Sequence, residues 1–127
     1  MADDPLLAPI EGADHRELGG VEIDILPAAN GRIKRAVYPP GHRWTERLRP
    51  LVGTDLCEHA HVGFLARGHV RGEYEDGCAF EFRAPAVVVI EAGHDAWVEG
   101  DEPAVLIQFD YEGETASRFG LPARHAH

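Results

Sequence analysis

The sequence is most strongly constrained by a succession of short segments in which apolar and polar residues alternate, separated by turn residues, between Val21 and Asp110. Two dipeptides, Asn30-Gly31 and Asp76-Gly77, are typical of tight β-hairpins, because these residue types tolerate the positive φ angles that such turns need. No segment shows the 3.6-residue apolar periodicity of a helix longer than a turn or two. The pattern therefore predicts an all-β sandwich or barrel.

The chain of 127 residues is long enough for one domain of ordinary size and too short for two. The segment His42–Arg49 is expected to be extended, because Pro40 and Pro50 closely bracket it. We expect an N-terminal arm at residues 1–20, a barrel at residues 21–112 and a C-terminal tail at residues 113–127. The tail is expected to contain one short helix. Strands are expected near Val21–Leu26, Ile33–Tyr38, Leu56–Ala66, Val70–Tyr74, Cys78–Arg83, Ala86–Ile90, Ala96–Val98 and Ala104–Asp110.

The composition excludes several classes of function. Twelve Lys and Arg against 22 Asp and Glu leave a net charge of -10, which repels nucleic-acid phosphates and anionic membrane surfaces. No apolar run approaches the ~20 residues of a membrane-spanning helix, and the acidic N-terminus lacks a signal-peptide pattern. We therefore expect a cytoplasmic protein whose two cysteines are free thiols or metal ligands, with no nucleic-acid or membrane partner.

The segment Asp55–His61 is the richest in groups that bind metals. Alternate residues of an extended strand share one face, which here carries Asp55, Cys57, His59 and His61. Sulfur with imidazole suits zinc, whereas imidazole with carboxylate suits iron, manganese or nickel. The alternative is a solvated strand edge on which these side chains only face water.

A second polar cluster, Glu91–Trp97, follows an apolar strand. Its glycine turn would aim His94 and Trp97 together, although such a turn also fits the solvated end of a hairpin. A small antiparallel barrel is wide enough inside to hold one small ligand or metal, so groups from distant strands can converge there. His125 and His127 lie in a polar tail and are assigned no role.

These segments resemble the two characteristic motifs of the cupin superfamily. The first motif contains His-x-His, a glutamate and, after six intervening residues, a glycine. When that glycine is aligned on Gly68, the glutamate position holds His61 and the second histidine position holds Cys57. The first histidine position then holds Asp55.

The second cupin motif, aligned on Gly93, holds Ala96 where the family has histidine, and His94 lies two residues earlier. The usual ligand set of three histidines and one glutamate is therefore absent. The sequence instead resembles a branch of small single-domain bacterial cupins in which a cysteine, a histidine and a Gly-His-Asp-Ala-Trp turn recur together. Cys57 and His61 occupy the first two of these places.

This resemblance implies a single-domain jelly-roll β-barrel of six to eight strands that holds a small molecule. It also implies a homodimer, formed through sheet edges or exchanged N-terminal strands. A divalent metal, with zinc favoured and iron or nickel also suitable, would be bound by Cys57, His61 and His94. Further candidate ligands or supporting groups are His59, Asp55 and Asp95, and the expected pocket-lining residues are Trp44, Phe64, Phe80 and Trp97.

The function expected from this resemblance is a metal-binding cupin, either a metal-dependent enzyme of unspecified reaction or a non-catalytic small-molecule sensor. A cupin without metal is the remaining alternative. Cys57 and Cys78 should not be disulfide-bonded, because Cys78 shares an apolar face with Phe80 and Phe82 whereas Cys57 belongs to the polar cluster. We further expect Trp97 to be largely buried, and metal affinity to fall below about pH 6, where unperturbed histidines protonate.

Overall fold

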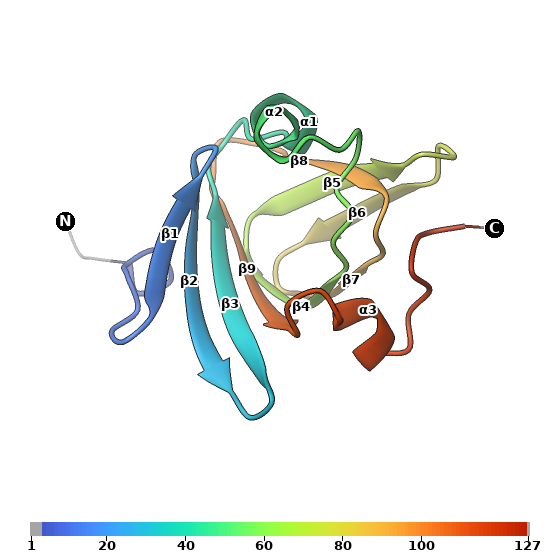
Figure 1. Ribbon diagram of the computed structural model, residues 1–127. Helices are drawn as coiled ribbons and strands as arrows, with labels where there is room; N and C mark the ends of the chain where they lie inside the picture. The colour runs from blue at the N-terminus through green and yellow to red at the C-terminus, as the bar shows by residue number, and fades with distance from the viewer. Residues whose placement is uncertain (1–3, 127) are drawn as a thin grey trace.

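The computed structural model describes residues 4–126, which form two antiparallel sheets around a common interior (Figure 1). The larger sheet has the strand order β1-β2-β3-β9-β4-β7 and the smaller sheet has the order β6-β5-β8. The predicted all-β jelly-roll fold is confirmed. The strands are β1 (Asp14–Leu18), β2 (Val21–Ala28), β3 (Gly31–Tyr38), β4 (His61–Arg67), β5 (His69–Tyr74), β6 (Ala79–Arg83), β7 (Ala86–Ile90), β8 (His94–Val98) and β9 (Ala104–Asp110).

Strand β9 lies between β3 and β4, so the last strand of the chain joins the N-terminal hairpin to the rest of the larger sheet. Its buried residues Leu106 and Gln108 line the interior, because alternate residues of a strand share one face. Leu106 belongs to the hydrophobic core together with Leu65 of β4 and Val88 of β7. No helix within residues 4–126 is long and apolar enough to cross a membrane.

Both predicted hairpins are present, but the first turn lies one residue earlier than its dipeptide indicates. Gly31 already pairs with Ala28, and the positive φ of 53° belongs to Ala29. A side chain on Gly31 would place its Cβ only 2.7 Å from Cε1 of Tyr111, so this glycine is required for close packing. In the second hairpin Gly77 itself has a φ of 89°.

The N-terminal arm contains a strand that the sequence did not indicate, β1, which pairs with β2. The preceding residues are held by Asp24, which is fully buried and accepts a 2.6 Å hydrogen bond from the backbone N–H of Ile10. Arg35 donates both to Asp24 (2.9 Å) and to the backbone oxygen of Leu6 (3.0 Å). A buried, hydrogen-bonded ion pair therefore fastens the arm to the sheet.

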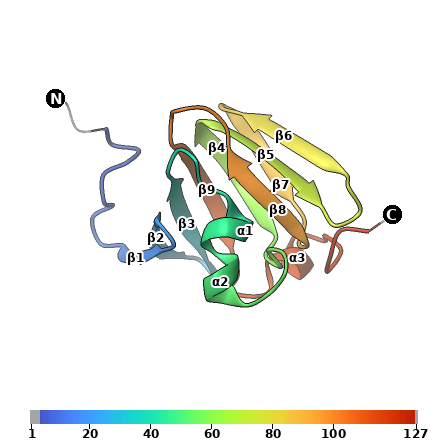
Figure 2. The same ribbon diagram turned by 90° about the horizontal axis from the view of Figure 1, so that it is seen from above.

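The segment expected to be extended instead forms two short helices, α1 (Trp44–Arg47) and α2 (Arg49–Val52). The side chain of Asp95 accepts the N–H of Thr45 at 3.1 Å, which satisfies a donor in the first turn of α1. Pro50 lies at the start of α2, where a missing N–H costs no hydrogen bond. Figure 2 shows both helices above the space between the sheets. The expected C-terminal helix is present as α3 (Thr115–Arg118).

The outer face of β4, β7 and β9 is apolar and uncovered. The exposed fraction is 73% for Val87 and 42% for Phe64, and these residues lie opposite each other in the register of β4 and β7. Val89 and Phe109 are also exposed on these strands. Strand β7 lies at the edge of the larger sheet. Burial alternates along Ala86–Ile90, so one face of β7 packs in the core and the other is exposed and apolar. We call the exposed surface formed by Phe64, Val87, Val89 and Phe109 the outer apolar face.

Candidate metal centre

Backbone hydrogen bonds bring the two sequence clusters together at one end of the barrel. The N–H of Cys57 donates to the backbone oxygen of His94 at 2.8 Å, and the N–H of Gly93 donates to the oxygen of Cys57 at 2.7 Å. Gly93 has a φ of 91°, a conformation that glycine adopts without strain. The side chains of Cys57 and His94 are consequently held next to each other although they are far apart in the sequence.

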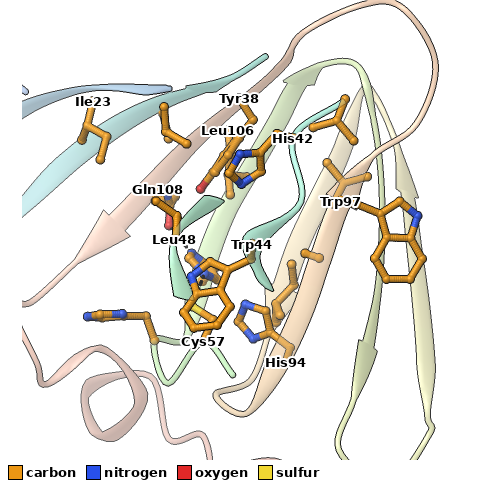
Figure 3. A pocket seen from close by; sticks show the side chains of 18 of the residues that line it. Ile23, Tyr38, His42, Trp44, Leu48, Cys57, His94, Trp97, Leu106 and Gln108 are labelled. Atoms are coloured by element: carbon orange, nitrogen blue, oxygen red, sulfur yellow. Dashed lines mark hydrogen bonds between the residues drawn. The ribbon is translucent and has the colours of Figure 1, made fainter. Parts of the chain in front are cut away.

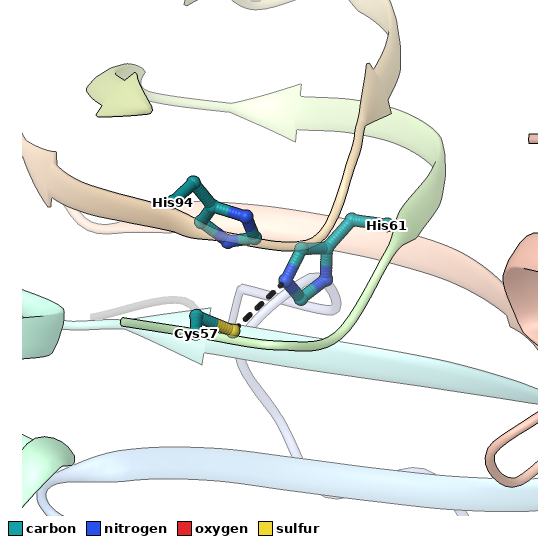
Figure 4. Close-up of side chains that lie close together, drawn as sticks. All are labelled: Cys57, His61 and His94. Atoms are coloured by element: carbon teal, nitrogen blue, oxygen red, sulfur yellow. Dashed lines mark hydrogen bonds between the residues drawn. The ribbon is translucent and has the colours of Figure 1, made fainter. Parts of the chain in front are cut away.

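His61, the first residue of β4, completes this group. Its Nδ1–H donates to Oε1 of Gln108 at 2.5 Å, which leaves Nε2 as the lone-pair nitrogen. This Nε2 lies 3.8 Å from Sγ of Cys57 (Figure 4). We call Cys57, His61 and His94 the interior cluster.

The ring of His94 is oriented by the backbone in the same manner. Its Nδ1–H donates to the backbone oxygen of Glu91 at 2.7 Å, so its Nε2 is also left with a free lone pair. The rings of His94 and His61 contact each other with centroids 5.1 Å apart. The potential ligand atoms of the interior cluster all lie within 4.8 Å of one another.

This arrangement fits a tetrahedral metal ion. Zinc bonds to sulfur at about 2.3 Å and to nitrogen at about 2.0 Å, which separates a sulfur and a nitrogen ligand by about 3.5 Å at the tetrahedral angle. The observed 3.8 Å between Sγ of Cys57 and Nε2 of His61 is close to that value. Metal-bound histidines ordinarily donate their other ring N–H to a fixed acceptor, and both histidines do so here.

Burial determines the protonation of the interior cluster. It lowers the pKa of His61 to about 3 and that of His94 to about 4, because the charged imidazolium is poorly solvated there. Burial raises the pKa of the Cys57 thiol to about 11 for the same reason. At neutral pH both imidazoles are therefore ready to bind a cation, and the thiol is the one group that must lose a proton.

The other ligand candidates do not join the interior cluster. Asp55 and His59 are exposed, because β4 begins only at His61 and the preceding residues do not alternate as a strand would. The buried carboxylate of Asp95 is fully engaged elsewhere, accepting hydrogen bonds from Arg43 (2.9 Å) and from Thr45. Asp95 therefore anchors α1 to β8. His127 lies outside the described residues.

A cavity of about 220 Å³ opens beside the interior cluster (Figure 3). The cluster residues are part of its lining, and most of the remaining lining is apolar. Of the aromatic residues expected there, Trp44 is buried in the lining, and Trp97 lines it but is partly exposed, beneath the guanidinium of Arg43. The expected burial of Trp97 is therefore only partial. Its indole N–H donates to Glu99 at 2.9 Å.

Two expected pocket residues lie elsewhere. Phe64 belongs to the outer apolar face, because its position in β4 is offset by one residue from the buried Leu65. Phe80 packs behind His94, with ring centroids 6.1 Å apart, and supports the cluster without lining the cavity. Within residues 4–126 neither Cys57 nor Cys78 forms a disulfide, as expected.

Polar residues that the sequence did not single out also line the cavity, and Gln108 and His42 are two of them. Gln108 orients His61, and its place on the inward face of an apolar strand was the available signal. His42 is buried against Tyr38, and burial lowers its pKa to about 4. Its Nδ1 is buried and has no hydrogen-bond partner in the described part of the chain. Such an atom favours a ligand or a water molecule in the cavity.

Comparison with known proteins supports the fold. No family model matches the sequence, and no curated protein matches it. Among solved structures, a cupin 2 conserved barrel domain protein from Salinispora arenicola CNS-205 is 17% identical, with a TM-score of 0.57 over 94% of this chain and 98% of that chain. A cupin-2 domain protein from Rhodospirillum rubrum is also 17% identical, with a TM-score of 0.56 over 83% of this chain and 74% of that one.

A third structure is an oxalate decarboxylase–formate complex from Lactobacillus farciminis. It is 16% identical, with a TM-score of 0.56 over 91% of this chain and 41% of that chain. The chain therefore has the conserved-barrel fold of the cupin superfamily.

Proposed function

We propose that this chain is a metal-binding cupin-fold protein that holds a small, largely apolar molecule in its barrel. The metal would be bound by Cys57, His61 and His94. The observation that carries this proposal is the orientation of both histidines. Each donates its Nδ1–H to a fixed acceptor and leaves Nε2 free toward the thiol.

Zinc is the metal that this donor set favours, because it prefers sulfur and nitrogen ligands and tetrahedral geometry. Three protein ligands leave one coordination position for water or a bound molecule, as in catalytic rather than structural zinc sites. When bound, the metal supplies Lewis acidity and lowers the pKa of a bound water. The chain itself supplies the orientation of the ligands and an apolar cavity beside them.

The cavity indicates the chemistry of the bound molecule. Trp44, Leu48 and the aliphatic residues of the barrel would contact an apolar body. The buried Nδ1 of His42 would hydrogen-bond a polar group at one position on that body. A volume of about 220 Å³ suits a small molecule. We therefore propose a compact ligand with an apolar framework and one polar group near His42.

Metal analysis of the purified chain tests the proposal. Equilibrium dialysis against zinc should give stoichiometric metal that Cys57→Ala and His94→Gln each remove from the interior cluster. His69→Gln is the matched control, because His69 pairs with Glu81 on the smaller sheet and lies outside the cluster. A cobalt-substituted protein should show sulfur-to-cobalt charge-transfer absorption that is reduced in Cys57→Ala. Unchanged metal content in both variants would refute the proposal.

We also propose that the protein forms a homodimer through the outer apolar face. Val87 and Phe64 form an exposed apolar surface beside the open edge of β7, and such surfaces mark interaction sites. A second copy related by a twofold axis would place apolar face on apolar face, which suits a chain whose net charge of -10 otherwise favours separation. Sedimentation equilibrium should show a dimer that Val87→Lys dissociates. A monomeric wild-type chain at micromolar concentration would refute this arrangement.

The setting proposed for this protein is the cytoplasm. Cys57 is buried and Cys78 is partly buried, and the two form no disulfide within the described residues. Cysteines that are not disulfide-bonded are typical of a reducing compartment. Fractionation of cells that express the full chain, with detection by an antibody, tests this assignment.

A further inference from the structure

A second group of metal-binding residues lies outside the barrel, between the β5–β6 hairpin and the C-terminal segment. The hairpin turn carries Asp76 and Cys78, and the segment carries His125. Figure 2 shows the C-terminal segment ending near the tip of this hairpin. We call Asp76, Cys78 and His125 the tail cluster.

The C-terminal segment is held in place at the tail cluster by hydrogen bonds from Arg124 and from the backbone of His125. The backbone N–H of His125 donates to the oxygen of Ala92 at 2.9 Å. The neighbouring Arg124 donates to Glu75 at 2.6 Å and to Glu58 at 3.0 Å. His125 is thus placed against the hairpin by contacts that are independent of its own ring.

The imidazole of His125 is oriented as a metal ligand would be. Its ring stacks on Tyr74 with centroids 3.7 Å apart, and its Nδ1–H donates to the carboxylate of Glu91 at 2.7 Å. Only 15% of the side chain is exposed. Nε2 then lies 3.3 Å from Oδ2 of Asp76. A carboxylate on the distal nitrogen of a histidine is the usual support of a metal-bound imidazole.

From this geometry we propose that the tail cluster is a second metal site, which takes zinc and fastens the C-terminal segment to the β5–β6 hairpin. The three potential ligand atoms lie within 4.8 Å of one another. A tetrahedral zinc ion separates a nitrogen and an oxygen ligand by about 3.3 Å, the distance found between His125 and Asp76. Thiolate, imidazole and carboxylate are all established zinc ligands.

A nucleophilic thiol is the competing interpretation, and the surrounding charges oppose it. Asp76 adjoins Cys78, and the carboxylate of Glu91 occupies the other nitrogen of His125. Burial and the neighbouring carboxylate of Asp76 raise the pKa of the Cys78 thiol, which disfavours the thiolate that nucleophilic attack requires. A divalent cation reverses this balance, because it is attracted by the same carboxylates and stabilises the thiolate directly.

The tail cluster also adjoins the interior cluster through one residue. The backbone oxygen of Glu91 accepts from His94, and its side chain accepts from His125. The backbone N–H of Glu91 donates to the hydroxyl of Tyr74 at 3.0 Å. A metal on the tail cluster would therefore hold the C-terminal segment over the turn that presents His94.

Zinc stoichiometry of the full chain separates the two sites. The wild type should bind two equivalents, and Cys78→Ser and His125→Gln should each bind one. Asp76→Asn keeps an oxygen that can accept from the N–H of Cys78 in the turn, and should weaken the second equivalent only. Asp101→Asn, at another exposed turn, is the matched control and should keep both.

Each outcome decides between the two metal assignments. If the wild type binds one equivalent that Cys57→Ala removes and Cys78→Ser retains, the tail site is refuted and the interior site stands. If the single equivalent is instead lost in Cys78→Ser, the interior site fails and the tail site stands. Two equivalents that survive in Cys78→Ser and His125→Gln would also refute the tail site.

Proteolysis measures the fastening itself. Zinc at about ten times its dissociation constant should slow tryptic cleavage at Arg124 about tenfold, because cleavage needs the metal-free, detached segment. The protection should disappear in Cys78→Ser and remain in Cys57→Ala. If zinc leaves the cleavage rate of the wild type unchanged, the proposal that zinc fastens the C-terminal segment to the β5–β6 hairpin is refuted.

Discussion

The interior and tail clusters offer similar donor atoms in opposite surroundings. In the interior cluster the thiol and both imidazoles face an apolar cavity, and Cys57 and His94 are buried. In the tail cluster Asp76 is exposed, and the imidazole is flanked by carboxylates. One site therefore consists of neutral groups in buried, largely apolar surroundings, and the other includes charged groups at the surface.

This difference shows that surroundings, rather than donor identity, govern how each site would attract a cation. Burial keeps His61 and His94 neutral and the Cys57 thiol protonated, so the interior cluster has no charge of its own to attract a metal. The selectivity of the interior cluster for a metal ion must therefore come from the orientation and spacing of its ligand atoms. The tail cluster has a carboxylate among its ligands, so its affinity must depend on charge and on the screening of that charge.

The largest expected effect concerns stability and compares two tryptophans that line the interior cavity. Trp44→Ala should lower the free energy of unfolding by about 3–5 kcal/mol, because it removes a large, buried aromatic ring from the interior. Trp97→Ala should cost about 1–2 kcal/mol, since its ring is partly exposed at the margin of the cavity. Urea denaturation of the metal-free proteins measures both. Equal losses would mean that the interior is no better packed than its margin.

The next largest effect concerns orientation of the interior ligands. Gln108→Leu should lower zinc affinity at the interior cluster by about 10–100-fold, because His61 loses the acceptor that fixes its ring. Gln108→Glu keeps an acceptor and should largely restore the affinity. Competition with a zinc chelator, in a Cys78→Ser background, measures the interior site alone.

A drop of similar size at the tail cluster in Gln108→Leu would show that the two sites are not separate. Gln108 would then act on the fold as a whole rather than on His61. Near-ultraviolet circular dichroism of the metal-free variant provides the check, since a local effect leaves the aromatic signal unchanged.

The pH dependence of zinc binding is expected to distinguish the interior cluster from an ordinary histidine site. Between about pH 5 and pH 10, affinity should rise about tenfold per pH unit, because binding releases one proton from a thiol whose pKa is about 11. The histidines add no further steepness there, since their pKa values of about 3 and 4 leave them neutral.

The predicted dependence of one proton per metal differs from the sequence-based expectation of a steep loss of affinity below about pH 6. Titrations of Cys78→Ser at pH 6, 7 and 8 measure the slope. A slope approaching three protons per metal near pH 6 would show that the imidazoles are solvated and that the interior is wetter than its burial indicates.

The sequence predicted those features that local patterns control. Short, largely apolar runs bounded by turn residues gave the strands Ala86–Ile90 and Ala104–Asp110 with their observed bounds. The alternation expected over Asp55–His61 is not regular, because the strand starts only at His61. Cys57 points inward because backbone hydrogen bonds pair it with His94, whereas Asp55 and His59 are exposed. Alternation predicts a shared face only within the strand itself.

Features that depend on distant residues were not predictable in this way. Helix α1 is stabilised by Asp95, which lies far along the chain, so the local sequence around Pro50 indicated an extended segment. His125 was assigned no role because its supporting groups, Glu91 and Tyr74, come from other parts of the fold. In both cases the tertiary contact supplies what the local pattern lacks.

The smallest expected effect is the response of the two metal sites to salt. Raising ionic strength from about 0.05 M to 0.5 M with sodium perchlorate should weaken zinc binding at the tail cluster about two- to fivefold more than at the interior cluster. The tail cluster is accessible to counterions and contains the exposed carboxylate of Asp76, whereas the interior ligands are shielded from them.

Chelator competition in Cys57→Ala measures the salt response of the tail cluster, and the same competition in Cys78→Ser measures that of the interior cluster. Asp76→Asn, made in the Cys57→Ala background, should reduce the salt dependence of the tail site, because it removes the charge that counterions screen. If both sites respond equally, the attraction arises from the overall charge of -10, and the contrast in local surroundings has no electrostatic consequence.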